Sequence, residues 1–182
     1  MRYVLLVSIL FLNCAFGATR QSMNVDQPAV KLPIADVIYV AQSTGGQTAI
    51  PFLRSAASDV EFSAALRQSI RSAGLFNETK DQPGTEWKLT TQIVRMEQKP
   101  FPFPSVEVEA EIRYVLSRQD VLVKEFYLLS DGRSTFADSI FFPARSRFAF
   151  ERAARANIQS LIVKLGQFQS ASNGVGPSHN NK

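Results

Sequence analysis

The chain has 182 residues, of which 45% are apolar and 20% are charged, and its formal net charge is +4. These values are typical of one globular domain and exclude the disordered and collagen-like classes. The positive charge is small and dispersed, without a basic stripe interleaved with aromatic residues, so no nucleic-acid partner is expected. Cys14 is the only cysteine and His179 the only histidine, so we expect no internal disulfide, no metal site and no cofactor.

Residues 1–17 have the features of an export signal. A basic residue precedes an apolar run over residues 3–12, and small residues follow at the positions that a signal peptidase reads. The run is too short to remain as a membrane-spanning helix. We therefore expect cleavage near Gly17 or Ala18, a location in the periplasm and no transmembrane helix in the mature chain. In a competing interpretation, Cys14 ends a lipobox-like sequence and is lipidated, which would attach the protein to the outer membrane.

The remaining chain divides into three parts. Residues 18–35 are polar and aperiodic, which predicts a flexible N-terminal arm. Residues 36–168 form the expected single domain. Residues 169–182 are rich in Ser, Asn and Gly, which predicts a disordered tail.

Four strands are expected in the domain, over residues 36–42, 87–96, 105–117 and 121–129. The third strand is the clearest, because apolar residues alternate there with Glu107, Glu109 and Glu111. The second strand changes phase near Ile93, which predicts a β-bulge. Residues 77–85 are expected to form a polar turn.

Two helices are expected, over residues 59–73 and 144–168. Ser58 and Glu61 have the spacing of a capping box at the start of the first helix, and Gly74 is placed to end it. The element order predicts an α+β fold of the type β-α-β-β-β-α. Its four-stranded, mostly antiparallel sheet would carry two helices packed on one face.

In this topology, three connections meet at one end of the sheet, and they carry unusually many apolar residues. An exposed patch of this kind would indicate a surface for a protein or lipid partner. The aromatic residues assigned to this interaction surface are Phe52, Phe101, Phe103, Phe141 and Phe142. The alternative is that these loops pack against each other as a small satellite cluster.

Arginines are concentrated in the first half of the second predicted helix. This cluster could bind phosphate or lipid headgroups. Its members are Arg145, Arg147, Arg152 and Arg155. The favoured interpretation is that they pair with Glu151 or with the glutamates of the third strand.

Catalysis has few candidate residues, because the predicted domain contains neither His nor Cys. Glu107, Glu109 and Glu111 share one face of a strand, but their spacing favours a solvated surface over a paired acid and base. We therefore expect no enzymatic activity.

The layout resembles small lipoproteins of the Gram-negative envelope: the lipoprotein that plugs the lipopolysaccharide translocon, and the auxiliary lipoproteins of lipid-transporting ABC systems. The similar segments are residues 62–66, residues 73–75, residues 112–116 and residues 151–165. The resemblance implies a non-enzymatic accessory or assembly protein that docks on an envelope complex. The alternative is a transport auxiliary protein that binds lipid or lipopolysaccharide, and a carboxylate-dependent hydrolase is a remote third.

Overall fold

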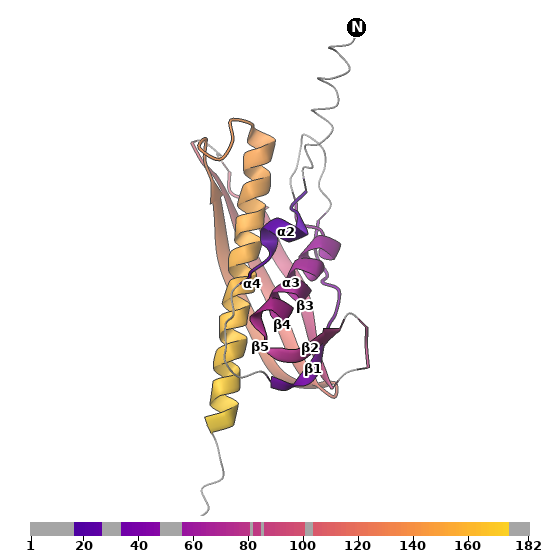
Figure 1. Cartoon of the computed structure of the whole chain (residues 1–182). Helices are drawn as coiled ribbons and strands as arrows, with labels where there is room; N and C mark the ends of the chain where they lie inside the picture. Colours follow the sequence, from indigo (N-terminus) through magenta and orange to yellow (C-terminus); the bar gives the residue numbers. More distant parts are fainter. Residues whose placement is uncertain are drawn as a thin grey trace, which may run out of the picture.

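One five-stranded sheet forms the centre of the computed structural model, with the strand order β2-β1-β3-β4-β5. The structure describes residues 17–26, 34–47, 56–80, 82–84, 86–100 and 104–174. The strands are β1 (Ile34–Val40), β2 (Phe76–Lys80), β3 (Trp87–Gln98), β4 (Val106–Arg118) and β5 (Val121–Ser134), and the helices are α2 (Arg20–Met23), α3 (Asp59–Ala73) and α4 (Phe142–Gly174). The helices all lie on one face of the sheet (Figure 1).

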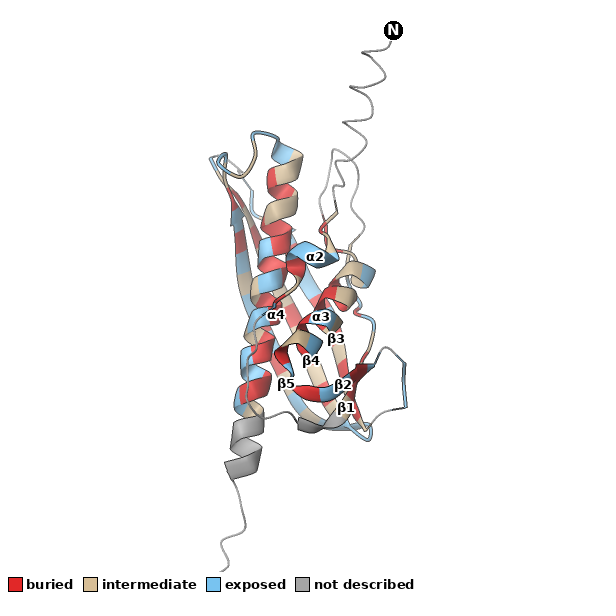
Figure 2. Ribbon diagram, viewed as in Figure 1, coloured by how far each residue is buried: buried red, intermediate tan, exposed pale blue. Residues whose placement is uncertain are grey.

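The core fills the space between the sheet and the helices. On β4, buried and half-buried residues alternate without a break from Val106 to Leu116, as expected for a strand with one covered face. Helix α4 places a stripe that includes Ala154, Ile158 and Leu161 against this face, and all three side chains are fully buried (Figure 2). The predicted α+β class is confirmed, and the described helices lie on one face of the sheet as expected (Figure 1), although there are three of them rather than two.

The predicted start and end of α3 and the predicted bulge in β3 are all present in the structure. The Ser58 hydroxyl accepts a hydrogen bond from the Glu61 backbone N–H and caps α3. Gly74 ends this helix in the left-handed region, with φ of +64°. The register between β3 and β4 shifts between Ile93 and Arg95, which is the predicted bulge.

The prediction of four strands is wrong by one, because residues 76–80 form the edge strand β2. Residues 77–80 of this segment were expected to belong to a polar turn over residues 77–85, which contains Pro83 and Gly84. The segment becomes a strand by pairing in parallel with β1. The side chains of Phe76 and Thr79 point toward the core and are buried. Strand β1 is also parallel to β3, whereas β3, β4 and β5 pair in antiparallel fashion. The sheet is therefore mixed, with two parallel and two antiparallel pairings.

The structure also differs from the expected flexible arm over residues 17–26. This segment contains the short helix α2 and packs against α3 and α4. Met23 and Val25 are buried in the core, and the Val25 N–H donates to the Ser69 hydroxyl across 2.9 Å. The segment is thus part of the folded domain.

The C-terminal helix is longer than expected. Helix α4 begins at Phe142 and continues to Gly174, so it enters the segment predicted to be a disordered tail. Among the described helices, none is long and apolar enough to cross a bilayer.

Candidate docking site

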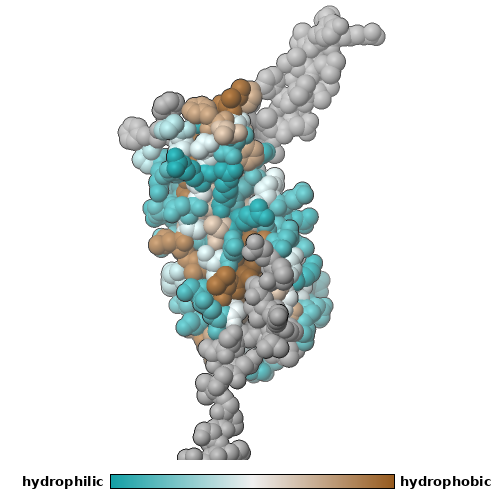
Figure 3. All heavy atoms as spheres, turned by 60° about the vertical axis from the view of Figure 1, so that its left-hand side comes forward, coloured by the Kyte–Doolittle hydropathy of each residue, from teal (hydrophilic) through white to brown (hydrophobic). Residues whose placement is uncertain are grey.

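The end of the molecule at which α4 begins carries a group of exposed apolar side chains. We call Phe136, Ile140, Phe141 and Phe142 the apolar tip; their exposed fractions are 45%, 75%, 63% and 40%. In Figure 3, apolar atoms gather at the upper end of the molecule. Large apolar residues exposed together are unusual on a protein that has no partner there.

The loop that presents the apolar tip is held by Asp138. Its carboxylate accepts a hydrogen bond from the Thr135 N–H across 2.8 Å and two from the Arg152 guanidinium, at 2.5 and 3.0 Å. Arg152 also donates to the Arg133 carbonyl oxygen, so it joins the end of β5, the loop and α4. These hydrogen bonds, chiefly the one from Arg152, hold the pKa of Asp138 well below its usual value.

Arg145 lies directly beneath the apolar tip. The residue is 5% exposed, and its guanidinium lies 4.0 Å from the centre of the Phe136 ring and 6.0 Å from that of Phe142. One of its nitrogens donates to the Pro104 carbonyl oxygen across 3.2 Å, while its Nε is buried without a hydrogen-bond partner. Among the described side chains, no carboxylate forms an ion pair with Arg145; the nearby acids Glu151 and Asp138 pair with Arg147 and Arg152.

The four arginines of the predicted anion site are therefore placed differently from one another. Arg147 pairs with Glu151 at 3.7 Å, which was the alternative foreseen for this cluster, and Arg152 pairs with Asp138. Arg155 is exposed on α4. Only Arg145 combines burial with a charge that no described acid balances, and anion binding by the cluster stays a prediction.

The predicted aromatic surface is described only in part. Phe141 and Phe142 are exposed at the tip, whereas Phe52, Phe101, Phe103 and the predicted lipidation site Cys14 lie outside the described residues. Sequence reasoning missed Phe136, since a single aromatic residue in a polar loop gives no periodic signal. It also missed the exposed Tyr127 and Leu129 on the open face of the edge strand β5.

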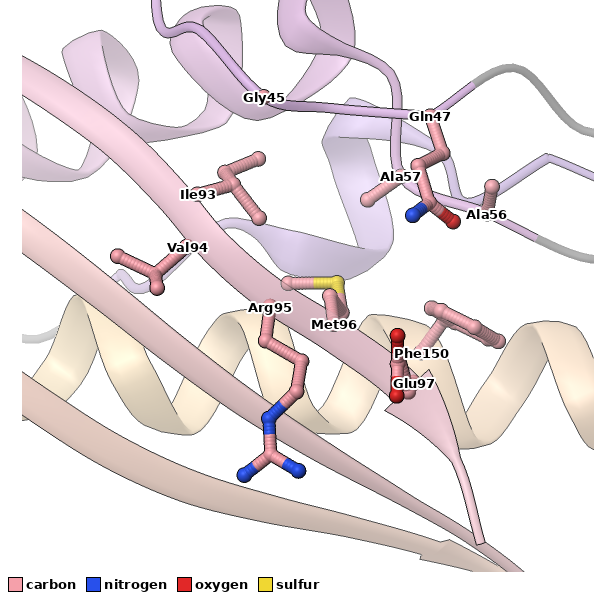
Figure 4. Close-up of a pocket in the computed structure, with 10 residues that line it drawn as sticks. All are labelled: Gly45, Gln47, Ala56, Ala57, Ile93, Val94, Arg95, Met96, Glu97 and Phe150. Atoms are coloured by element: carbon pink, nitrogen blue, oxygen red, sulfur yellow. The ribbon is translucent and has the colours of Figure 1, made fainter.

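The hollows among the described residues are small. A cavity of about 40 Å³ lies between the end of β3, helix α4 and two stretches of chain that precede α3, which are residues 45–47 and 56–57. In Figure 4, Ile93 and Met96 face it from β3, Ala57 from the opposite wall and Phe150 from α4. A second hollow, of about 250 Å³, is lined mainly by Thr and Gln side chains. Ligand pockets are usually larger and mostly apolar, so neither hollow indicates a small-molecule site.

The glutamates on the open face of β4 lie among cations. Glu109 and Glu111 both pair with Arg95, and Glu107 lies 3.8 Å from both Lys99 and Arg133. In the described part of the chain, no three His, Cys, Asp or Glu residues are grouped to hold a metal ion. This arrangement is that of a solvated sheet face with cross-strand ion pairs.

No protein-family model and no curated protein sequence matches the chain. Its fold is similar to that of a DUF330-family protein from Xanthomonas campestris, with 14% identity and a TM-score of 0.63 over 85% of this chain and 97% of the other. It is also similar to a candidate lipoprotein from Caulobacter crescentus, with 13% identity and a TM-score of 0.50 over 74% of this chain and 91% of the other. A third likeness, to rare lipoprotein B from Shewanella oneidensis, has 12% identity and a TM-score of 0.43, and covers 75% and 96% of the two chains. The first two likenesses show a shared fold.

Proposed function

We propose that this protein is a non-enzymatic accessory component of a Gram-negative cell envelope and that it docks there through the apolar tip. The observation that carries the proposal is the exposure of four large apolar side chains, those of Phe136, Ile140, Phe141 and Phe142, next to one another at one end of the domain. The export signal predicted over residues 1–17 and the fold shared with a candidate lipoprotein support an envelope location.

A docking role suits the described chemistry better than a catalytic one. An acid–base mechanism would need a titratable group in a cleft, with its pKa moved toward neutrality. The carboxylates on the open face lie instead on a flat strand beside cations. The hydrolase interpretation therefore has no support from the arrangement of Glu107, Glu109 and Glu111.

The test uses the chain with Cys14→Ser as the parent, so that no acyl chain can hold it in the envelope, and compares it with the same chain carrying Phe141→Ser and Phe142→Ser, both produced in a Gram-negative host. Because both rings are exposed, we expect thermal stability and export to stay unchanged while association with the envelope fraction is lost. The matched control is Val121→Ser with Leu122→Ser, which removes two exposed apolar side chains at the opposite end of β5. If the tip variant stays in the envelope fraction as fully as the control, the proposal is wrong.

A further inference from the structure

The apolar tip combines rings at its surface with one buried cation behind them. Phe136 and Phe142 cover the Arg145 guanidinium, and Ile140 and Phe141 extend beyond the start of α4 with more than half of their surface exposed. A buried charge without a counter-ion costs free energy. The Phe136 ring and the Pro104 carbonyl oxygen offset part of this cost, and negative charge at the surface of the tip would offset more of it through the electric field.

The N-terminal segment enters the domain at the same end. The Ala18 N–H donates to the Ala56 carbonyl oxygen across 3.0 Å. The Thr19 N–H donates to the Glu151 carboxylate on α4, also across 3.0 Å. In Figure 1, α2 lies beside the half of α4 that begins at the tip.

The distance from this anchor to the tip follows from helix geometry. Glu151 is nine residues after Phe142 in α4, which corresponds to a rise of about 14 Å. Cys14 precedes Thr19 by five residues, and five residues reach at most about 17 Å. In the interpretation in which Cys14 is lipidated, the acyl anchor would therefore hold the domain close to the membrane, with the apolar tip within reach of the same surface.

From these observations we infer that the apolar tip binds a lipid bilayer directly. The side chains of the apolar tip enter the interface, where aromatic and aliphatic groups are stabilised. The positive charge of Arg145 lies behind them and attracts anionic headgroups without direct contact. This inference rests on the proposed function and names the partner of the same site. It does not require that Cys14 be lipidated, since the contact is made by the folded domain.

The experiment measures binding to vesicles that contain only phosphatidylethanolamine and phosphatidylglycerol. The protein is the chain with Cys14→Ser, purified after export and removal of the signal segment, so that neither an acyl chain nor the apolar run over residues 3–12 can bind the vesicles. It is compared with the same chain carrying Phe141→Ser and Phe142→Ser. We expect the partition into vesicles to fall about tenfold or more, because each ring removed loses its apolar burial. The Val121→Ser, Leu122→Ser chain should bind as the parent does.

A fluorescence measurement gives a second readout that does not depend on weakened variants. Trp87 is the only tryptophan, and it pairs with Arg118 at the end of the sheet opposite the tip. With Phe141→Trp, lipids brominated in their acyl chains should quench the new tryptophan, whereas Trp87 in the parent chain should keep its emission.

The outcomes separate the inference from the proposed function. Loss of vesicle binding in the tip variant, with quenching of the tryptophan at position 141, supports the inference. If the parent does not bind vesicles but the tip variant leaves the envelope fraction, the inference is wrong and the tip docks on a protein instead. If parent and tip variant bind vesicles equally, the inference is also wrong. If the tip variant remains in the envelope fraction, the proposed function fails.

Discussion

The Tyr114 hydroxyl donates a hydrogen bond to Oδ1 of Asn157 across 2.9 Å, and both residues are fully buried between β4 and α4. The Asn157 amide in turn donates to the Leu128 carbonyl oxygen and the Ser130 hydroxyl of β5, each at 3.0 Å. Burial raises the pKa of Tyr114 well above its usual value, so the hydroxyl stays protonated as the donor. One side-chain amide thus ties α4 to two strands.

Replacing Tyr114 by Phe should destabilise the domain by about 1–3 kcal/mol, because Oδ1 of Asn157 would remain buried without a partner. Urea denaturation of the variant and the parent measures this difference. Tyr127→Phe is the control, since Tyr127 is exposed and should change stability by less than about 0.5 kcal/mol. Equal stability of the two variants would show that the buried hydrogen bond contributes nothing measurable.

The sequence was sufficient to predict elements whose signals are local. The alternation along β4, the capping residue Ser58 and the phase change at Ile93 each depend on a few neighbouring residues. The edge strand β2 could not be predicted in this way. Its pairing with β1 joins Phe76 to a strand about forty residues earlier, a contact that tertiary structure supplies.

Gly132 illustrates the same limit. The last strand was expected to end at residue 129, yet Asp131, Gly132 and Arg133 all belong to β5. A Cβ at position 132 would lie 2.0 Å from the Ala149 carbonyl oxygen and 2.4 Å from the Ala153 nitrogen. The glycine is therefore required for the close approach of α4 to β5, and a sequence alone does not show which helix approaches a strand.

The candidate site was predictable only in outline. The concentration of apolar residues before the second predicted helix indicated the tip, and Phe141 and Phe142 lie there. The pairing of Arg147 with Glu151 follows from their i,i+4 spacing on α4 and was the foreseen alternative. The pairing of Arg152 with Asp138 was not predictable, because Asp138 reaches α4 only when the loop after β5 packs against that helix.

Met23 provides a test of the N-terminal segment, whose docking the sequence did not predict. The Met23 side chain is fully buried, so Met23→Ala should lower the free energy of unfolding by about 2–5 kcal/mol. Chemical denaturation measures this change. Arg20→Ala is the matched control, because the Arg20 side chain on the same short helix is exposed and only its backbone N–H bonds to Glu61. A loss for Met23→Ala no larger than for the control would mean that the segment is not docked in solution.

Asp138 should control the conformation of the loop that carries the apolar tip. Its pKa is lowered, so its stabilising contribution is complete above the unfolded value of about 3.9 and is lost as the pH falls through the lowered folded-state value. Hydrogen-exchange protection of residues 135–141 should therefore be constant from neutral to mildly acidic pH and decrease only in strong acid.

Asp138→Asn keeps the shape of the side chain but removes the charge that binds Arg152. We expect faster amide exchange in residues 135–141 at neutral pH and weaker docking of the tip, since Phe136 and Ile140 would no longer be held in one arrangement. Asp131→Asn is the control, because Asp131 pairs with Lys99 on an exposed site at the same end and does not contact the loop through any described hydrogen bond. Unchanged protection in Asp138→Asn would contradict this role, since the loop would then be ordered by its apolar contacts and by Arg145 rather than by the bond between Arg152 and Asp138.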